Sequence, residues 1–141
     1  FSSYQSEYPF SMILKKGNIL TPIYSLTNVD SDQNYILFRN IVEDPISENF
    51  NAYLVNYKTK KIEDKFDLKT NYTNCFKIDK KLIRPEMFFV TKNFIGVPMF
   101  ASVKDSFVSF EHSQPPFEYI LSKNNHIKVS DLKKEFNEII N

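Results

Sequence analysis

Apolar and polar residues alternate with a period of two in short runs along most of this chain, and turn-forming residues separate the runs. This period turns successive side chains to opposite sides of a strand, and in short runs it is typical of antiparallel sheets. The clearest example is a predicted β-hairpin whose arms are residues 52–57 and 61–68, joined by the polar segment 58–60. The expected faces are Tyr53, Val55 and Tyr57 on the first arm and Ile62, Phe66 and Leu68 on the second.

Other runs also have the composition of strands. Pro22 lacks the N–H that a sheet ladder needs, so the run that contains it is expected at an edge or a bend. Runs that are apolar on both faces in the third quarter indicate strands covered on both sides, or strands with one face left for a partner. The expected strand regions are residues 10–14 (Phe10, Met12, Leu14), 19–26, 35–42, 75–78, 87–90, 94–103, 107–110 and 117–121.

The pattern changes to a helical period at the end of the sequence. Leu132, Phe136, Ile139 and Ile140 recur at spacings that place them on one stripe of a helix. Ser130 is the expected capping residue before this helix. We therefore expect an amphipathic helix over residues 130–140 that docks on the sheet.

These patterns predict a mainly β fold: a two-layer antiparallel sandwich, or a strongly bent half-open barrel, of 7–10 short strands with one C-terminal amphipathic helix. The order of strands followed by a closing helix resembles the pleckstrin-homology type of half-open barrel in architecture alone, and architecture does not assign a function. We expect a single domain over residues 1–141. Its expected parts are an extended arm (1–9), a β domain (10–129) and the helix (130–140).

Composition excludes several classes of protein. The chain has 141 residues with a net charge of +1, and its only two glycines, Gly17 and Gly96, argue against phosphate-cradling loops. A single cysteine, Cys75, excludes a disulfide framework and is expected to be a buried or half-buried hydrophobe. Every apolar stretch ends well before the ~18 residues that a transmembrane helix needs, so we expect a soluble chain.

Catalytic and metal-binding motifs are missing from the sequence. The two histidines, His112 and His126, and Cys75 do not have the spacing of zinc ligands. No nucleophile elbow, phosphate-binding lysine loop or dinucleotide fingerprint occurs. We expect no catalytic residue, no metal and no cofactor. A hydrolase that uses His112 with Glu111 or Glu118 is the least favoured alternative.

Positive charge is concentrated in the middle of the chain. Residues 51–104 have a net charge of +6, whereas residues 1–50 have −3 and residues 105–141 have −2. Lysines at two predicted turns suggest an anion-binding patch for phosphate, anionic lipid or an acidic protein surface. The simpler interpretation is that they solvate the sheet and protect its edges. Nucleic acid is not an expected partner, because Arg is scarce. The lysines concerned are Lys58, Lys60, Lys61, Lys80 and Lys81.

Aromatic residues provide the main functional expectation. Aromatic side chains concentrate at the centres of protein interfaces, and the sequence predicts a non-catalytic module that binds another protein or subunit. The sequence begins with Phe1, so we expect a processed chain or a part of a larger protein or assembly. The lone cysteine and the glycosylation sequon at Asn71 fit either side of a membrane. The candidate contact residues are Phe1, Tyr4, Tyr8, Phe88 and Phe94.

Overall fold

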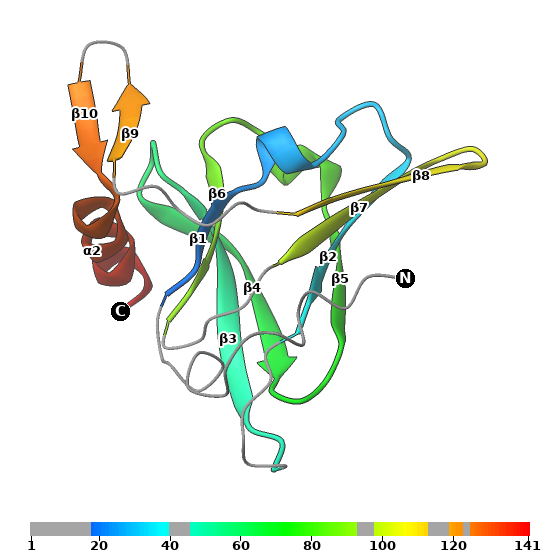
Figure 1. The fold of residues 1–141 in the computed structure, drawn as a ribbon, viewed down its shortest axis with the longest axis horizontal. Coiled ribbons are helices and arrows are strands. Elements are labelled where there is room, and N and C mark those ends of the chain that lie inside the picture. The colour runs from blue at the N-terminus through cyan, green and yellow to red at the C-terminus, as the bar shows by residue number, and fades with distance from the viewer. Residues whose placement is uncertain (1–17, 40–45, 93–97, 113–118, 123–124) are drawn as a thin grey trace, which may run out of the picture.

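The computed structural model describes residues 18–39, 46–92, 98–112, 119–122 and 125–141. The predicted arm and the predicted strand over residues 10–14 lie outside these residues. The described chain is mainly β, with two antiparallel four-stranded sheets that pack as a sandwich and one C-terminal helix (Figure 1). This confirms the predicted fold class.

Each sheet joins strands that are distant in the sequence. In sheet A the order is β1 (Leu20–Pro22), β6 (Met87–Thr91), β3 (Asn49–Asn56) and β4 (Lys61–Lys69). In sheet B it is β5 (Asn74–Ile78), β2 (Gln33–Phe38), β7 (Met99–Lys104) and β8 (Phe107–His112). The remaining elements are the 3-10 turns η2 (Tyr24–Leu26) and η3 (Lys80–Leu82), the hairpin strands β9 (Tyr119–Ser122) and β10 (Asn125–Lys128), and the helix α2 (Val129–Ile140).

The main core lies between the inner faces of the two sheets. Phe38 of sheet B contacts two rings of sheet A, with centroid distances of 5.9 Å to Phe50 and 6.1 Å to Phe89. All three rings are buried, as are Leu54 of β3 and Phe100 of β7. Burial of each such side chain stabilises the fold by about 1.5–3 kcal/mol, so this apolar layer holds the sandwich together.

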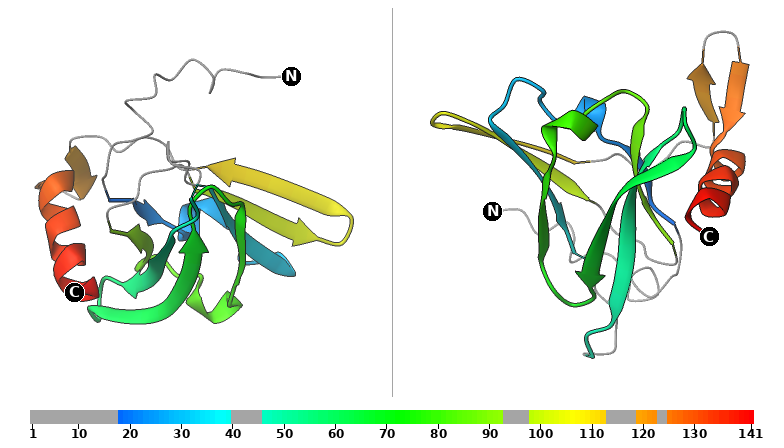
Figure 2. Two further views of the ribbon diagram at one scale, coloured as in Figure 1. Left: turned by 90° about the horizontal axis from the view of Figure 1, so that it is seen from below. Right: turned by 180° about the vertical axis from the view of Figure 1, so that it is seen from behind.

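The helix α2 covers the outer face of sheet A (Figures 1 and 2). Phe136 is fully buried there, with its ring centroid 5.3 Å from that of Tyr57 and 5.1 Å from that of Phe88. The apolar stripe is as predicted, but the helix starts one residue earlier, because buried Val129 extends the stripe by one position. Ser130 consequently lies inside the helix, and no side chain caps the N-terminus; the expected Ser130 cap was wrong.

The predicted β3–β4 hairpin is present, but one of its faces differs from the expectation. Phe66 and Leu68 face the inter-sheet core opposite Ala52 and Phe50, whereas Ile62 pairs with Val55. The register shifts after Leu54, because β4 has one extra residue there, Glu63. Such a bulge turns the side chains beyond it to the other face. The predicted alignment of Ile62 with Phe66 and Leu68 was therefore wrong.

Two other expectations concern single residues in the sheets. Pro22 lies in β1, which is an edge strand of sheet A, and this confirms the edge prediction. Cys75 is exposed, contrary to the expectation that it is at least half-buried. Its neighbour Asn74 takes the inward position on β5 and is buried. Since side chains alternate along a strand, Cys75 points outward.

Candidate protein-interaction surface

The outer face of sheet B has an apolar centre. Direct partners in antiparallel strands have their side chains on the same face, and the register pairs Tyr35 with Ala101 and Ala101 with Phe110. Ile36, Phe38 and Phe100 occupy the inner positions, so their neighbours point outward. The outer face of sheet B, as the term is used below, consists of Tyr35, Leu37, Met99, Ala101, Val103, Val108 and Phe110.

This apolar surface is most accessible along β8. All six residues of β8 are exposed. On this face the exposed fractions are 57% for Phe110, 55% for Val108 and 42% for Met99 on the adjacent strand, whereas Phe107, which is 77% exposed, points to the opposite face. Figure 2 shows the β7–β8 hairpin projecting beyond the sandwich, on the side away from α2. No described element covers these side chains in the way that α2 covers sheet A.

The free edge of β8 is also less protected from pairing than the other sheet edges. Short length, Pro, charged residues and bulges are the usual protection. At the edges of sheet A, β1 has three residues and contains Pro22, and β4 contains the Glu63 bulge and alternating charges. The edge strand β5 has five residues, including Lys77. By contrast, β8 has six residues in regular register and no Pro, and its one residue of Lys, Arg, Asp or Glu type is Glu111 near its end.

One of the predicted anion-binding lysines takes part in the contact between the β3–β4 turn and α2. The Lys60 ammonium lies 3.3 Å from the centroid of the Tyr57 ring and 3.8 Å from a Glu135 carboxylate oxygen. The Tyr57 hydroxyl donates a 2.8 Å hydrogen bond to the same carboxylate. This hydrogen bond, aided by burial and by the negative charge of Glu135, raises the pKa of Tyr57. Lys60 thus interacts with two residues of its own chain.

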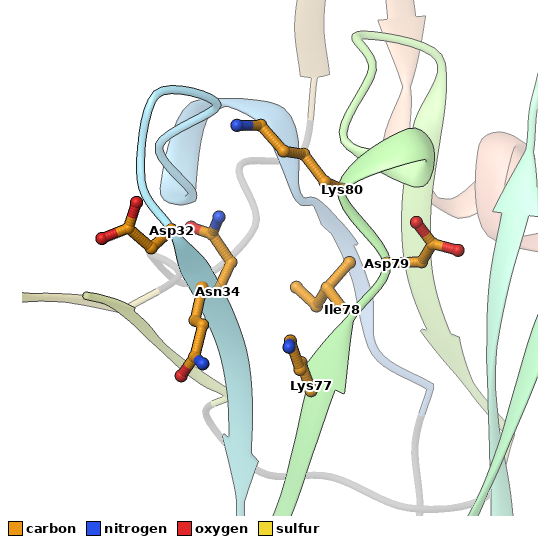
Figure 3. Close-up of a pocket in the computed structure, with 7 residues that line it drawn as sticks. Asp32, Asn34, Lys77, Ile78, Asp79 and Lys80 are labelled. Atoms are coloured by element: carbon orange, nitrogen blue, oxygen red, sulfur yellow. The ribbon is translucent and has the colours of Figure 1, made fainter. Parts of the chain in front are cut away.

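Lys60 and Lys80, which come from the two different turns, line different hollows. Lys80 lines a hollow of about 440 Å³ at the adjoining ends of β2 and β5 (Figure 3), whereas Lys60 lines a separate depression beside α2. The hollow contains Lys77 and Lys80 but also Asp32 and Asp79, so the charges of its lining residues cancel. Lys58 and Lys61 are exposed at the β3–β4 turn, and Lys81 is exposed in η3.

The other predicted site residues are distributed as follows. Phe88 contacts Tyr57 and Phe136 under α2, with its ring centroid 6.2 Å from that of Tyr57. Glu111 and His112 are adjacent in β8, so their side chains point to opposite faces of the sheet. Among the residues that the structure describes, no cluster of three or more His, Cys, Asp or Glu is suited to hold a metal ion. Residues Phe1, Tyr4, Tyr8, Phe94 and Glu118 lie outside the described ranges.

The residues of the exposed hairpin were not among the predicted contact residues. The sequence contained a usable signal, because Phe107, Val108 and Phe110 form an apolar run on both faces with no lysine among them. The run alone does not reveal that β8 ends its sheet. That position follows from the pairing of β7 with β2, which are more than 60 residues apart in the sequence.

Comparisons of this chain with protein-family models, with curated proteins and with solved structures find no match. Within the described ranges, no helix is long and apolar enough to cross a membrane.

Proposed function

We propose that this chain is a non-catalytic interaction module, an accessory domain of a larger protein or assembly, that binds a protein partner through the outer face of sheet B and β8. The supporting observation is the group of exposed apolar side chains on the β7–β8 hairpin. With about 200 Å² for a whole Phe, the exposed part of Phe110 amounts to roughly 110 Å². Met99 and Val108 are 42% and 55% exposed on the same face, so the contiguous apolar area approaches the lower end of the range of about 300–600 Å² that is often functional.

The shape and chemistry of this surface favour a protein partner. Aromatic residues and Met are enriched at the centres of protein interfaces, and polar residues form the rim. Here Phe110, Val108 and Met99 form the centre, and the exposed polar residues Gln33, Lys77 and His112 lie on the same face at its margins. A sheet face is suited to an extended contact with another macromolecule.

The test is affinity capture with an altered surface. The variant V108T/F110T keeps residues that favour strands and removes most of the apolar area. The control I62T makes a similar change at an exposed isoleucine on β4. We expect the wild-type chain and I62T to retain the same partner subunit, and V108T/F110T to lose at least about 90% of it, which is a loss of 1.4 kcal/mol or more. Equal recovery by all three proteins would contradict the proposal.

A further inference from the structure

We propose that the free edge of β8 pairs with β8 of a second copy of this chain, in antiparallel register about a two-fold axis. This inference rests on the proposed function, because it concerns the same β7–β8 hairpin and names a second copy of the chain as the partner of its edge. The result would be one continuous eight-stranded sheet made of two copies of sheet B. The outer faces of the two copies would then form one joint surface.

The first argument concerns the backbone. In an edge strand, the N–H and C=O groups of alternate residues point away from the sheet, and an edge without protection pairs with other strands. The described residues place no strand on the outer side of β8. An isologous pair closes on itself, because each copy uses its own edge on the other. Pairing with a second copy therefore removes both edges without building a fibre.

The second argument is that β8 is complementary to itself. A two-fold axis perpendicular to the sheet keeps each side chain on its own face, so residues of β8 with the same parity must oppose each other. Two such registers, centred on Ser109 and on Phe110, each pair five of the six residues of β8, and the register centred on Ser109 gives the larger number of apolar pairs. It places Val108 opposite Phe110 of the second copy, twice, and Phe107 opposite Glu111. No like charges oppose each other, and apolar cross-strand pairs of this kind contribute about 0.2–1 kcal/mol each.

The third argument concerns space and area. Figures 1 and 2 show β8 on the side of the molecule opposite α2, where the projecting hairpin leaves room for another sheet. The exposed apolar area of one hairpin is smaller than the roughly 800 Å² per partner of a standard stable interface, so we expect a weak, concentration-dependent dimer. Pairing would bury part of this area together with the backbone edge. The Val108 and Phe110 side chains of both copies would then lie next to each other at the centre of the joint face.

The oligomeric state gives the first test. We expect sedimentation velocity of the 141-residue chain to show a concentration-dependent shift from 16.7 kDa to twice that mass. The variant S109K places two ammonium groups opposite each other at the axis and should weaken dimerisation at least about tenfold. The control T59K adds the same charge at the exposed β3–β4 turn and should leave dimerisation unchanged. Circular dichroism verifies that both variants are folded.

Cysteine cross-linking tests the register. In a C75S background, S109C should form an intermolecular disulfide under mild oxidation, because residues opposite each other at the axis have Cα atoms about 4.5–5.5 Å apart. K61C on the edge of β4, in the same C75S background, is the control and should form no intermolecular disulfide.

Three results would overturn this inference: a monomer at every concentration, a dimer that S109K does not weaken, or cross-linking of K61C as readily as S109C. None of them affects the capture experiment, in which the loss of a partner subunit depends on V108T/F110T. Failure of the dimer and failure of the proposed function are therefore distinguishable.

Discussion

Asn74 shows how one buried polar side chain joins three strands. Its Nδ2 atom lies 3.1 Å from the Phe38 carbonyl oxygen and 2.9 Å from that of Lys69, and its Oδ1 atom accepts a 3.0 Å hydrogen bond from the Lys69 N–H. These contacts connect β5 to β2 and to the end of β4. The amide thus satisfies backbone groups where the chain passes from sheet A to sheet B.

We expect N74A to destabilise the fold by about 2–4 kcal/mol, because it leaves buried backbone donors and acceptors without their partner. The measurement is the free energy of unfolding from urea titration. T73A, which changes the exposed neighbour, is the matched control and should cost less than about 1 kcal/mol. Similar losses in the two variants would contradict the role assigned to Asn74.

Tyr57 predicts a dependence of stability on alkaline pH. Its pKa is raised, mainly by the hydrogen bond to Glu135, so folding favours the protonated phenol. The contribution to stability is complete below the unfolded pKa of about 10 and is lost as the pH rises through the folded pKa. At pH 8 we expect the free energy of unfolding of wild type to exceed that of Y57F by about 1 kcal/mol. The value is this small because the Tyr57–Glu135 pair is partly exposed to solvent.

The measurement for Tyr57 is urea unfolding of both proteins between pH 8 and 12. Subtracting the free energy of unfolding of Y57F from that of wild type removes the pH dependence of the groups that both proteins share. One such group is Lys133, whose pKa is lowered by burial. A difference between wild type and Y57F that stays constant with pH would contradict the assignment.

At the scale of elements, α2 depends on the sheet that it covers. Helices of this length are marginal alone in water, so its stability comes from the apolar stripe. We expect F136A to cost about 3–5 kcal/mol, the usual loss for a buried Phe. The matched control F110A removes an exposed ring and should cost less than about 1 kcal/mol in dilute protein, where association is negligible. Thermal or urea unfolding measures both.

The sequence predicted elements whose pattern is local, and it failed where the outcome depends on pairing. The β3–β4 hairpin and α2 have their own periods, and both were found. The reversal of Ile62 was missed because a bulge depends on the register of two strands and leaves no mark in the alternation of one. Exposed Cys75 was misjudged because its side was decided by Asn74, whose inward position depends on hydrogen bonds to β2 and β4.

The candidate site shows the same limit. The sequence predicted contact through aromatic residues, and the exposed phenylalanines Phe107 and Phe110 lie on an edge strand. The sequence suggested that the lysines at residues 58–61 and 80–81 form one anion-binding patch if the two turns lie at the same end of the sheet. Lys60 contacts Tyr57 and Glu135, and Lys80 lines another hollow together with Asp32 and Asp79. Which side chains meet at the ends of a sandwich is decided by tertiary pairing.

At the scale of the whole molecule, the outer faces of the two sheets differ in what covers them. The outer face of sheet A is closed by the chain's own helix, whereas β8 and its neighbours on sheet B meet no described element. This difference predicts a pattern of amide hydrogen exchange. Exchange in β8 should slow as the protein concentration rises from about 5 to 500 µM, while exchange in β1 should not change. Exchange in β8 that is independent of concentration would contradict pairing at that edge.

The exposed position of Cys75 has a practical consequence. Its thiol is the only one in the sequence, and it lies on the outward side of β5 opposite Leu37. A fluorophore attached there needs no engineered residue and would sit beside the apolar surface. Quenching or a spectral shift of such a label would report when a binding partner covers that surface, in real time and with the native sequence.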